Sequence, residues 1–225
     1  MRVTEKEIVR ARKTKEQITK LHEEGYKLKE LTISMVTANV MGIIYGLVFS
    51  IPFLIAYYLN FGYLFGGPDE TLLEQCIILI LLVASFPVHE AIHGLCMYFF
   101  NGRNKSLIEF GFMGGNPYCT CQSPINKTKY IIFAVMPTLV LGSIFAIPAL
   151  TIGKLWWLIL LVCTITGAGG DFTIIYKLLK QKGNNIQIVD HPYKCGFFAL
   201  CKEFDTDDYD TVTSEIDALE VKNKD

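Results

Sequence analysis

This sequence lacks the features that mark nucleic-acid-binding and disulfide-rich secreted proteins. Its 21 Lys and Arg are balanced by 22 Asp and Glu, and the basic residues near the amino terminus alternate with acidic ones. That pattern excludes a basic footprint for nucleic acid. The seven cysteines are odd in number and scattered, which argues against an extracellular disulfide framework. Residues 1–30 have no short apolar core followed by a cleavage site, so we expect no cleavable signal peptide.

Long apolar segments are what the sequence does contain, and hydrophobic residues make up 51% of it. Four stretches come close to the roughly 20 residues that a helix needs to cross a bilayer. They run from Ser34 to Tyr58, from Leu73 to Phe100, from Tyr130 to Ile152 and from Leu155 to Leu179. We therefore predict an all-α integral membrane fold with four transmembrane helices. Gly42 and Gly46 form a GxxxG pair suited to close helix contact.

The segments between these stretches differ in charge. The amino-terminal arm has nine Lys and Arg, and the 101–129 loop and the 177–182 segment are also basic. The 59–72 loop contains Asp69 and Glu70 but no Lys or Arg. The positive-inside rule then places both termini and the 101–129 loop in the cytoplasm. The prediction is a multi-pass protein of the cell membrane, with the lipid bilayer as its first partner.

A short β-hairpin is expected in the 101–129 loop. Extended-looking runs at 107–113 and 118–122 flank the turn residues 114–117. Cys119 and Cys121 would share one face of the second strand, as a metal-binding pair or as reduced thiols without a role. One more short strand is expected over Ile186–Val189.

The second apolar stretch carries the sequence His89-Glu90-Ala91-Ile92-His93. Histidines at i and i+4 project from the same face of a helix and can both bind one Zn²⁺. The intervening Glu90 is then placed beside the metal, where it can act as a general base. Ionisable residues within a membrane segment are costly and usually mark function.

A catalytic zinc site usually has three protein ligands, and Asp171 is the preferred third candidate. His93 and His89 lie 8 and 12 residues before Asn101, and Asp171 lies 9 residues before Lys180. The second and fourth helices would both run from the outside to the cytoplasm. At about 1.5 Å per residue, all three side chains would then lie at a similar depth in the membrane. The alternatives are that Asp171 only forms hydrogen bonds within the bundle, and that His191 is the third ligand. If it is not a ligand, we expect His191 to be a surface residue, the alternative being a contact to the substrate or transition state.

These motifs together resemble the bacterial putative zincin peptidase domain family, which is similar to the site-2-protease class of intramembrane zinc metalloproteases. The matching segments are the histidine motif, Met136-Pro137, Gly170-Asp171-Phe172 and Asp190-His191-Pro192. Carried over, the resemblance implies His89, His93 and Asp171 as zinc ligands and Glu90 as the catalytic base. Site-2 proteases typically have an Asp-Gly sequence at the third ligand, whereas Asp171 here precedes Phe172.

The resulting hypothesis is a zinc metalloendopeptidase that hydrolyses a peptide bond of a membrane-protein or peptide substrate near the cytosolic membrane face. The alternative is a metal-binding but non-proteolytic membrane protein: another zinc hydrolase, a metal handler or a structural scaffold. We expect a cytosolic, amphipathic N-terminal helix within residues 1–30, a membrane-embedded peptidase-like domain over 31–200 and an acidic C-terminal tail over 201–225. That tail would be mobile or form a loosely packed helix. The sequence does not predict the oligomeric state.

Overall fold

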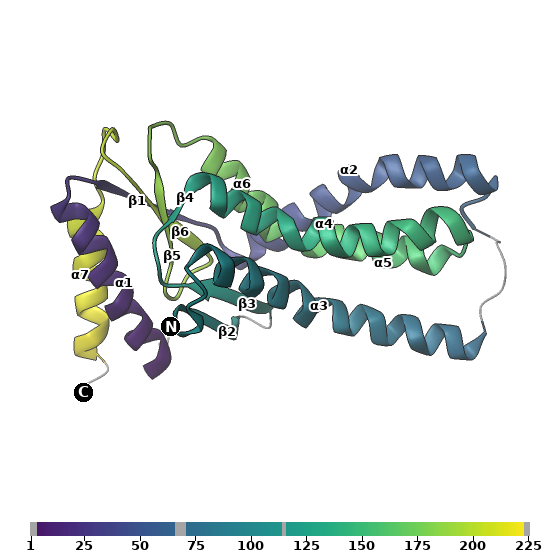
Figure 1. The fold of residues 1–225 in the computed structure, drawn as a ribbon, viewed down its shortest axis with the longest axis horizontal. Helices are drawn as coiled ribbons and strands as arrows, with labels where there is room; N and C mark the ends of the chain where they lie inside the picture. The colour runs from purple at the N-terminus through teal and green to yellow at the C-terminus, as the bar shows by residue number, and fades with distance from the viewer. Residues whose placement is uncertain (1–3, 66–70, 114–115, 223–225) are drawn as a thin grey trace.

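The computed structural model describes residues 4–65, 71–113 and 116–222. Its elements are mostly helices and follow one another as α1 (Glu5–Glu23), β1 (Lys27–Thr32), α2 (Met35–Phe61), α3 (Leu72–Phe100), the 3₁₀ turn η1 (Lys105–Leu107), β2 (Ile108–Met113), β3 (Asn116–Cys121), β4 (Ile125–Asn126), α4 (Lys127–Ile152), α5 (Leu155–Gly167), α6 (Gly169–Leu179), β5 (Gln187–Asp190), β6 (Gly196–Cys201) and α7 (Tyr209–Lys222). Figure 1 shows an elongated molecule, with α2, α3, α4 and α5 extending from one end and the strands, α1 and α7 at the other.

The long helices are the segments predicted from their apolar composition. α2, α3 and α4 are each long and apolar enough to cross a membrane, and α5 with α6 would make a fourth span bent by 43°. The expected mostly helical architecture is therefore confirmed, with three helices, or four spans if the bent pair counts as one, that suit a membrane by length and composition. The structure differs from a straight fourth helix because the chain bends at Ala168, among the small residues Gly167, Gly169 and Gly170.

Glycine allows α2 to approach α5 and α6 very closely. A Cβ added at Gly169 would lie 2.0 Å from the Cα of Gly42, and one added at Gly46 would lie 2.0 Å from Oγ1 of Thr166. No side chain fits at either contact. The predicted GxxxG pair thus lies at a helix interface, and this interface holds the start of α6 against α2.

The strands form a four-stranded antiparallel sheet, in the order β1-β6-β5-β4, which lies between the helical bundle and the two terminal helices. Phe197 and Ala199 of β6 face the cluster that contains Met97 and Phe133 of the bundle. Phe198 and Leu200 face the opposite way, toward α1 and α7. The fold is thus mostly helical rather than all-α. The strand predicted at 186–189 is present as β5, but β6 was missed because burial on both faces removes the alternation that indicates a strand.

The two terminal helices, α1 and α7, pack against each other and against the outer face of the sheet. α1 begins with a capping box between Thr4 and Glu7. In α7, Val212 and Ile216 are buried in the same cluster as Ile18 of α1. The acidic C-terminal segment is therefore a packed helix in its described part.

The predicted hairpin is formed by β2 and β3, which pair antiparallel from Ile108↔Cys121 to Met113↔Asn116. Of its predicted turn, Gly114 and Gly115 lie outside the described residues. The hairpin rests on α3 at Gly94, where an added Cβ would lie 2.4 Å from the ring of Phe110. This contact is one residue beyond His93, so the hairpin lies directly against the histidine motif.

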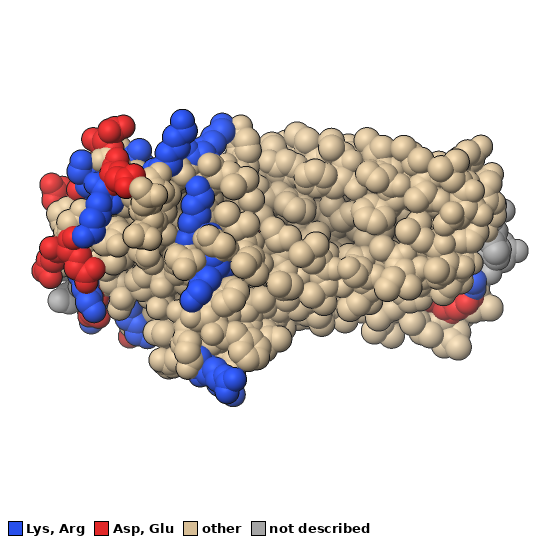
Figure 2. Space-filling view, turned by 45° about the horizontal axis from the view of Figure 1, so that its top comes forward, with Lys and Arg blue, Asp and Glu red and all other residues tan. Residues whose placement is uncertain are grey.

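Charged side chains gather at the sheet end of the molecule, and the long helical end is almost free of them (Figure 2). An ion pair between Lys154 and Glu74 lies at the opposite tip. Between these two zones, α2 and α5 contain no Asp, Glu, Lys or Arg. This distribution is typical of a protein whose helical part lies in lipid.

Candidate metal centre

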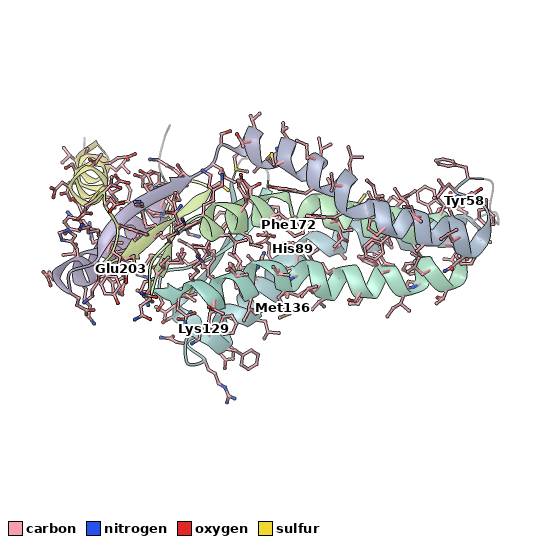
Figure 3. The ribbon with its side chains drawn as sticks, turned by 90° about the horizontal axis from the view of Figure 1, so that it is seen from above. Tyr58, His89, Lys129, Met136, Phe172 and Glu203 are labelled. Atoms are coloured by element: carbon pink, nitrogen blue, oxygen red, sulfur yellow. The ribbon has the colours of Figure 1, made fainter. Side chains whose placement is uncertain are left out.

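The histidine motif lies within α3, at the level where the helices meet the sheet. His89 lies between Glu203 at the sheet end and Tyr58 at the far tip in Figure 3. The ring centroids of His89 and His93 are 4.8 Å apart, as expected for neighbours one helical turn apart. Both imidazoles therefore present nitrogens to the same space beside α3.

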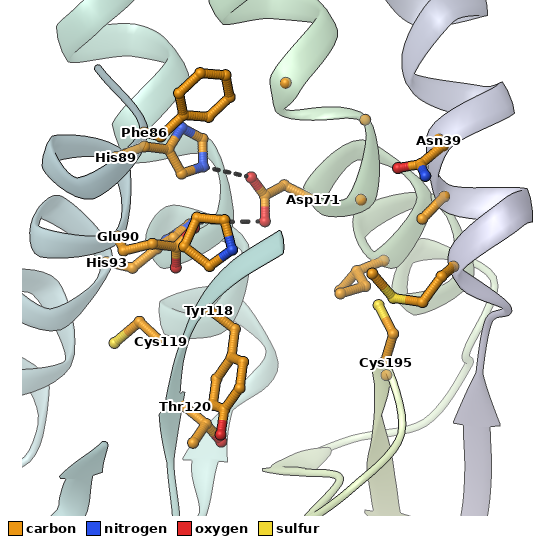
Figure 4. Close-up of a pocket in the computed structure, with 18 of the residues that line it drawn as sticks. Asn39, Phe86, His89, Glu90, His93, Tyr118, Cys119, Thr120, Asp171 and Cys195 are labelled. Carbon is orange, nitrogen blue, oxygen red and sulfur yellow. Dashed lines mark hydrogen bonds and ion pairs between the residues drawn. The ribbon is translucent and has the colours of Figure 1, made fainter. Parts of the chain in front are cut away.

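Asp171, in the first turn of α6, faces both histidines (Figure 4). Its Oδ2 lies 3.0 Å from Nε2 of His89, and its Oδ1 lies 3.4 Å from Nε2 of His93. The ligand atoms of these three residues all lie within 4.8 Å of one another. The structure thus brings together three side chains that are separated by up to 82 positions in sequence.

These three side chains fit a zinc ion. Two imidazoles and a carboxylate are among the usual ligands of catalytic zinc. Ligands placed tetrahedrally at about 2.0–2.1 Å from the metal lie about 3.3 Å apart. The separations of 3.0 and 3.4 Å between Asp171 and the two histidines are close to that spacing. Among the described residues, this is the only cluster of three or more His, Cys, Asp or Glu with such geometry.

His93 is held by α4 through its other ring nitrogen. Nδ1 of His93 lies 3.1 Å from the backbone carbonyl oxygen of Phe133, and the two rings pack with centroids 4.4 Å apart. A proton on Nδ1 donates to that carbonyl, which leaves the Nε2 lone pair directed toward Asp171 and available for a metal. Orientation of a ligand histidine by such a partner is characteristic of metal sites.

Glu90 lies on the side of α3 that faces the hairpin. The backbone N–H of Cys119, in β3, is within hydrogen-bonding reach of its carboxylate. Glu90, His89, His93 and Asp171 all line one cavity of about 500 Å³. In the described parts of α2 to α5, the acidic residues are Glu74 at the tip and Glu90. The charge in the middle of the bundle is therefore confined to this cavity.

The cavity extends from the bundle to the sheet. It is lined by Phe86 of α3 on one side and by Asn39 of α2 on the opposite side, with Tyr118 of β3 below them in Figure 4. Tyr130 of α4 and Asp190 of β5 also line it. A chain segment placed against β3 would thus lie beside Glu90 and the metal-ligand cluster.

His191 is buried, with 5% of its surface exposed, so its expected position at the surface was wrong. Its Nδ1 accepts hydrogen bonds from the backbone N–H groups of Tyr193 and Lys194, and its Nε2 lies 3.3 Å from Glu30. Burial lowers the pKa of His191. The structure places both of its ring nitrogens among these groups rather than with His89 and His93.

Asp190 is a polar residue of the site to which the sequence analysis assigned no role. It is 9% exposed, and burial raises its pKa although three hydrogen bonds favour the carboxylate. The donors are Oγ1 of Thr120, the N–H of Cys121 and the hydroxyl of Tyr130. The only sequence signal was its place in the Asp190-His191-Pro192 motif.

The two cysteines of β3 do not lie in a cluster of three metal-ligating residues among the described residues. Burial raises the pKa of both thiols, to about 12 for Cys121. Sγ of Cys121 also accepts a hydrogen bond of 3.0 Å from Asn101. In this environment the protonated thiol is favoured over the thiolate that metals bind.

The structure thus combines an apolar helical bundle with a His-His-Asp cluster that could hold a metal ion, next to a glutamate. In agreement with this, residues 82–186 match the model of a family described as putative zincin peptidase. The match includes the histidine motif and Asp171, so the resemblance stated from the sequence motifs is confirmed. No curated protein and no solved structure matches the chain.

Proposed function

We propose that this protein is a membrane-embedded zinc metallopeptidase, with His89, His93 and Asp171 as metal ligands and Glu90 as the general base. The observation that carries the proposal is the convergence of the three ligand atoms within 4.8 Å, in a bundle otherwise almost free of charge. Burial of such groups is costly unless they are paired or bind a cation. The match to the zincin peptidase family supports a peptidase over other zinc proteins.

The roles of the side chains follow from their positions. When bound, zinc lowers the pKa of a water molecule and polarises a scissile carbonyl. Glu90 accepts the proton of the attacking water and later delivers it to the leaving amine. Phe133 holds His93 in the orientation that keeps Nε2 free. Asp171 places a carboxylate between the two imidazoles, which favours a divalent cation there.

A substrate would bind in extended form along the hairpin. A membrane helix hides its backbone in internal hydrogen bonds, so its scissile bond must be unwound before water can attack it. Residues 117–120 of β3 line the cavity, and an added strand beside them would lie next to Glu90. Unchanged cleavage of a membrane substrate after deletion of the hairpin would contradict this binding mode.

The proposed topology has four spans, counting α5 and α6 as one, with both termini and the hairpin in the cytoplasm. The charge of the loops supports this orientation, because the basic segments all lie at the sheet end (Figure 2). The site then lies near the cytosolic membrane face. The three-part division at residues 30 and 200 remains part of this proposal. Reporter fusions in the 59–72 loop test the orientation, and they should report the side opposite to the termini.

Metal analysis of detergent-purified protein tests the centre. Wild type should contain about one zinc per chain, and Asp171→Ala should lose most of it. Glu90→Gln separates the peptidase from a non-proteolytic metal protein, because a peptidase loses turnover but keeps zinc. The same variant can trap substrates for identification. Metal-free wild type that folds normally, together with normal folding of His93→Ala, would favour a structural scaffold instead.

A further inference from the structure

Asp190 connects the two sides of the metal centre. Its Oδ1 accepts a hydrogen bond of 2.6 Å from the hydroxyl of Tyr130, at the start of α4. Its Oδ2 accepts bonds of 2.7 Å from the N–H of Cys121 and 3.1 Å from Oγ1 of Thr120, both in β3. One buried carboxylate on the sheet thereby ties a strand of the hairpin to a helix of the bundle.

Each of these ties leads to a residue of the proposed active site. On the α4 side, the rings of Tyr130 and Phe133 are in edge contact, with centroids 5.2 Å apart, and Phe133 holds His93. On the β3 side, Cys119 is two residues before Cys121, and its N–H is directed toward Glu90. The carboxylate of Asp190 is thus linked to a metal ligand through Tyr130 and Phe133, and to the general base through Cys121 and Cys119.

The hydrogen-bond network around Asp190 has to offset the free-energy cost of burying a carboxylate. Burying a carboxylate without partners is costly, so the group persists only where its donors are fixed. Here all three donors converge on a group that is nine-tenths buried. Fully paired buried networks restrict their surroundings to one arrangement. A site needs such a restricted arrangement when its functional side chains are held by two different elements.

We propose that Asp190 is a positioning residue that fixes the separation between Glu90 and the His93 imidazole by tying β3 to α4. It touches neither metal nor substrate. The inference rests on the proposed function, because it assigns Asp190 a part in the same centre. It predicts that metal binding depends on a residue at the sheet, away from the three ligands.

Zinc affinity of the full-length protein in detergent tests the inference, with Zn²⁺ alone as the probe and a competing chelator as the readout. Asp190→Ala should weaken zinc binding about 10-fold, as loss of outer partners of ligand histidines does. Asp190→Asn should bind more tightly than Asp190→Ala, because the amide oxygen can accept from β3 while the amide group donates to Tyr130. The absorption spectrum of bound Co²⁺ should shift in Asp190→Ala at saturating metal.

Asp207→Ala is the matched control. Asp207 also accepts two backbone hydrogen bonds, from Leu28 and Tyr209, and pairs with His22, but it lies on the far side of the sheet. This variant should lose stability while it keeps wild-type zinc affinity and the wild-type Co²⁺ spectrum. A purely structural role for Asp190 would make its variants behave in the same way.

If Asp190→Ala does not fold, Tyr130→Phe is measured in its place, because it removes only the hydroxyl that donates to Asp190. It should weaken zinc binding several-fold. Wild-type affinity and spectrum in Tyr130→Phe and in every folded Asp190 variant would overturn the inference and leave the proposed function intact. Wild-type protein that binds no zinc would overturn both.

Discussion

The helical bundle and the sheet end of this molecule differ in how they accommodate charged groups. In the bundle, α2 and α5 contain no charged residue, and large apolar side chains are exposed over the surface. At the sheet end, charged groups are frequent and paired, as in the contact of Lys194 with Glu30 and Glu215. The candidate centre lies at the border between the two. The difference teaches that the bundle tolerates charge only where another charge or a cation balances it.

The largest effect should come from removing the base at this border. Glu90→Gln should lower peptide hydrolysis about 10²- to 10⁴-fold, the usual contribution of a general acid–base group, with zinc content unchanged. Glu74→Gln is the matched control, because it makes the same change at the far end of the same helix and should leave turnover unchanged. Rates on an identified substrate measure both. Equal losses in the two variants would contradict the assignment of Glu90.

A lysine in the bundle tests whether its exposed apolar surface faces lipid. Leu47, near the middle of α2, is 65% exposed, and Leu47→Lys should cost about 2.5–3.5 kcal/mol of membrane insertion. Val9 in α1 is also exposed, at 46%, but it lies at the sheet end, so Val9→Lys should have no effect. The inserted fraction in a glycosylation-based insertion assay measures the difference. If both variants insert like wild type, the bundle surface does not require lipid.

Helix contact in the bundle should be sensitive to a single methyl group. Gly169→Ala places a Cβ against the backbone of α2 at Gly42 and should destabilise the protein by about 1–3 kcal/mol. Gly167 has no heavy atom within 4 Å of an added Cβ, so Gly167→Ala should be close to neutral. Denaturant unfolding in detergent measures both. A neutral Gly169→Ala would show that α2 and α6 can separate without cost.

Acid should weaken the sheet end through Glu30. Hydrogen bonding to His191, and then to Lys194, lowers the pKa of Glu30 from 4.5 to about 2. A carboxyl group with a lowered pKa in the folded state stabilises that state above its unfolded pKa, and the contribution is lost as the pH falls from about 4.5 toward 2. Glu30→Gln should therefore lower Tm by a few degrees at pH 7, and the difference should shrink over that pH range. A difference that does not depend on pH would contradict the ion-pair origin.

The sequence predicted the parts of the molecule whose signals are local. Helix periodicity places His89 and His93 together, and the depth count joins Asp171 to them, because both depend only on regular helix geometry. The role of Phe133 could not be predicted, since a backbone carbonyl has no sequence signal. Asp190 was overlooked for a related reason: its donors lie 60 to 70 positions away in the chain.

The sheet was only partly predictable because its strands come from distant segments. β1 pairs with β6, from Lys27↔Cys201 to Thr32↔Gly196, although all the helices of the bundle lie between the two strands in the sequence. No local pattern indicates such a pairing. The burial of His191 follows from it, since Glu30 of β1 is its partner. A single histidine next to a proline carries no information about a strand that begins at Lys27, 164 residues earlier.

The bend at Ala168 has an electrostatic consequence. It makes Asp171 a residue of the first turn of α6, instead of the middle of one long helix. The first N–H groups of a helix lack intrahelical acceptors, and the positive end of the helix dipole stabilises a nearby anion by about 0.3–1 kcal/mol. The backbone itself thereby lowers the cost of placing a carboxylate at this depth.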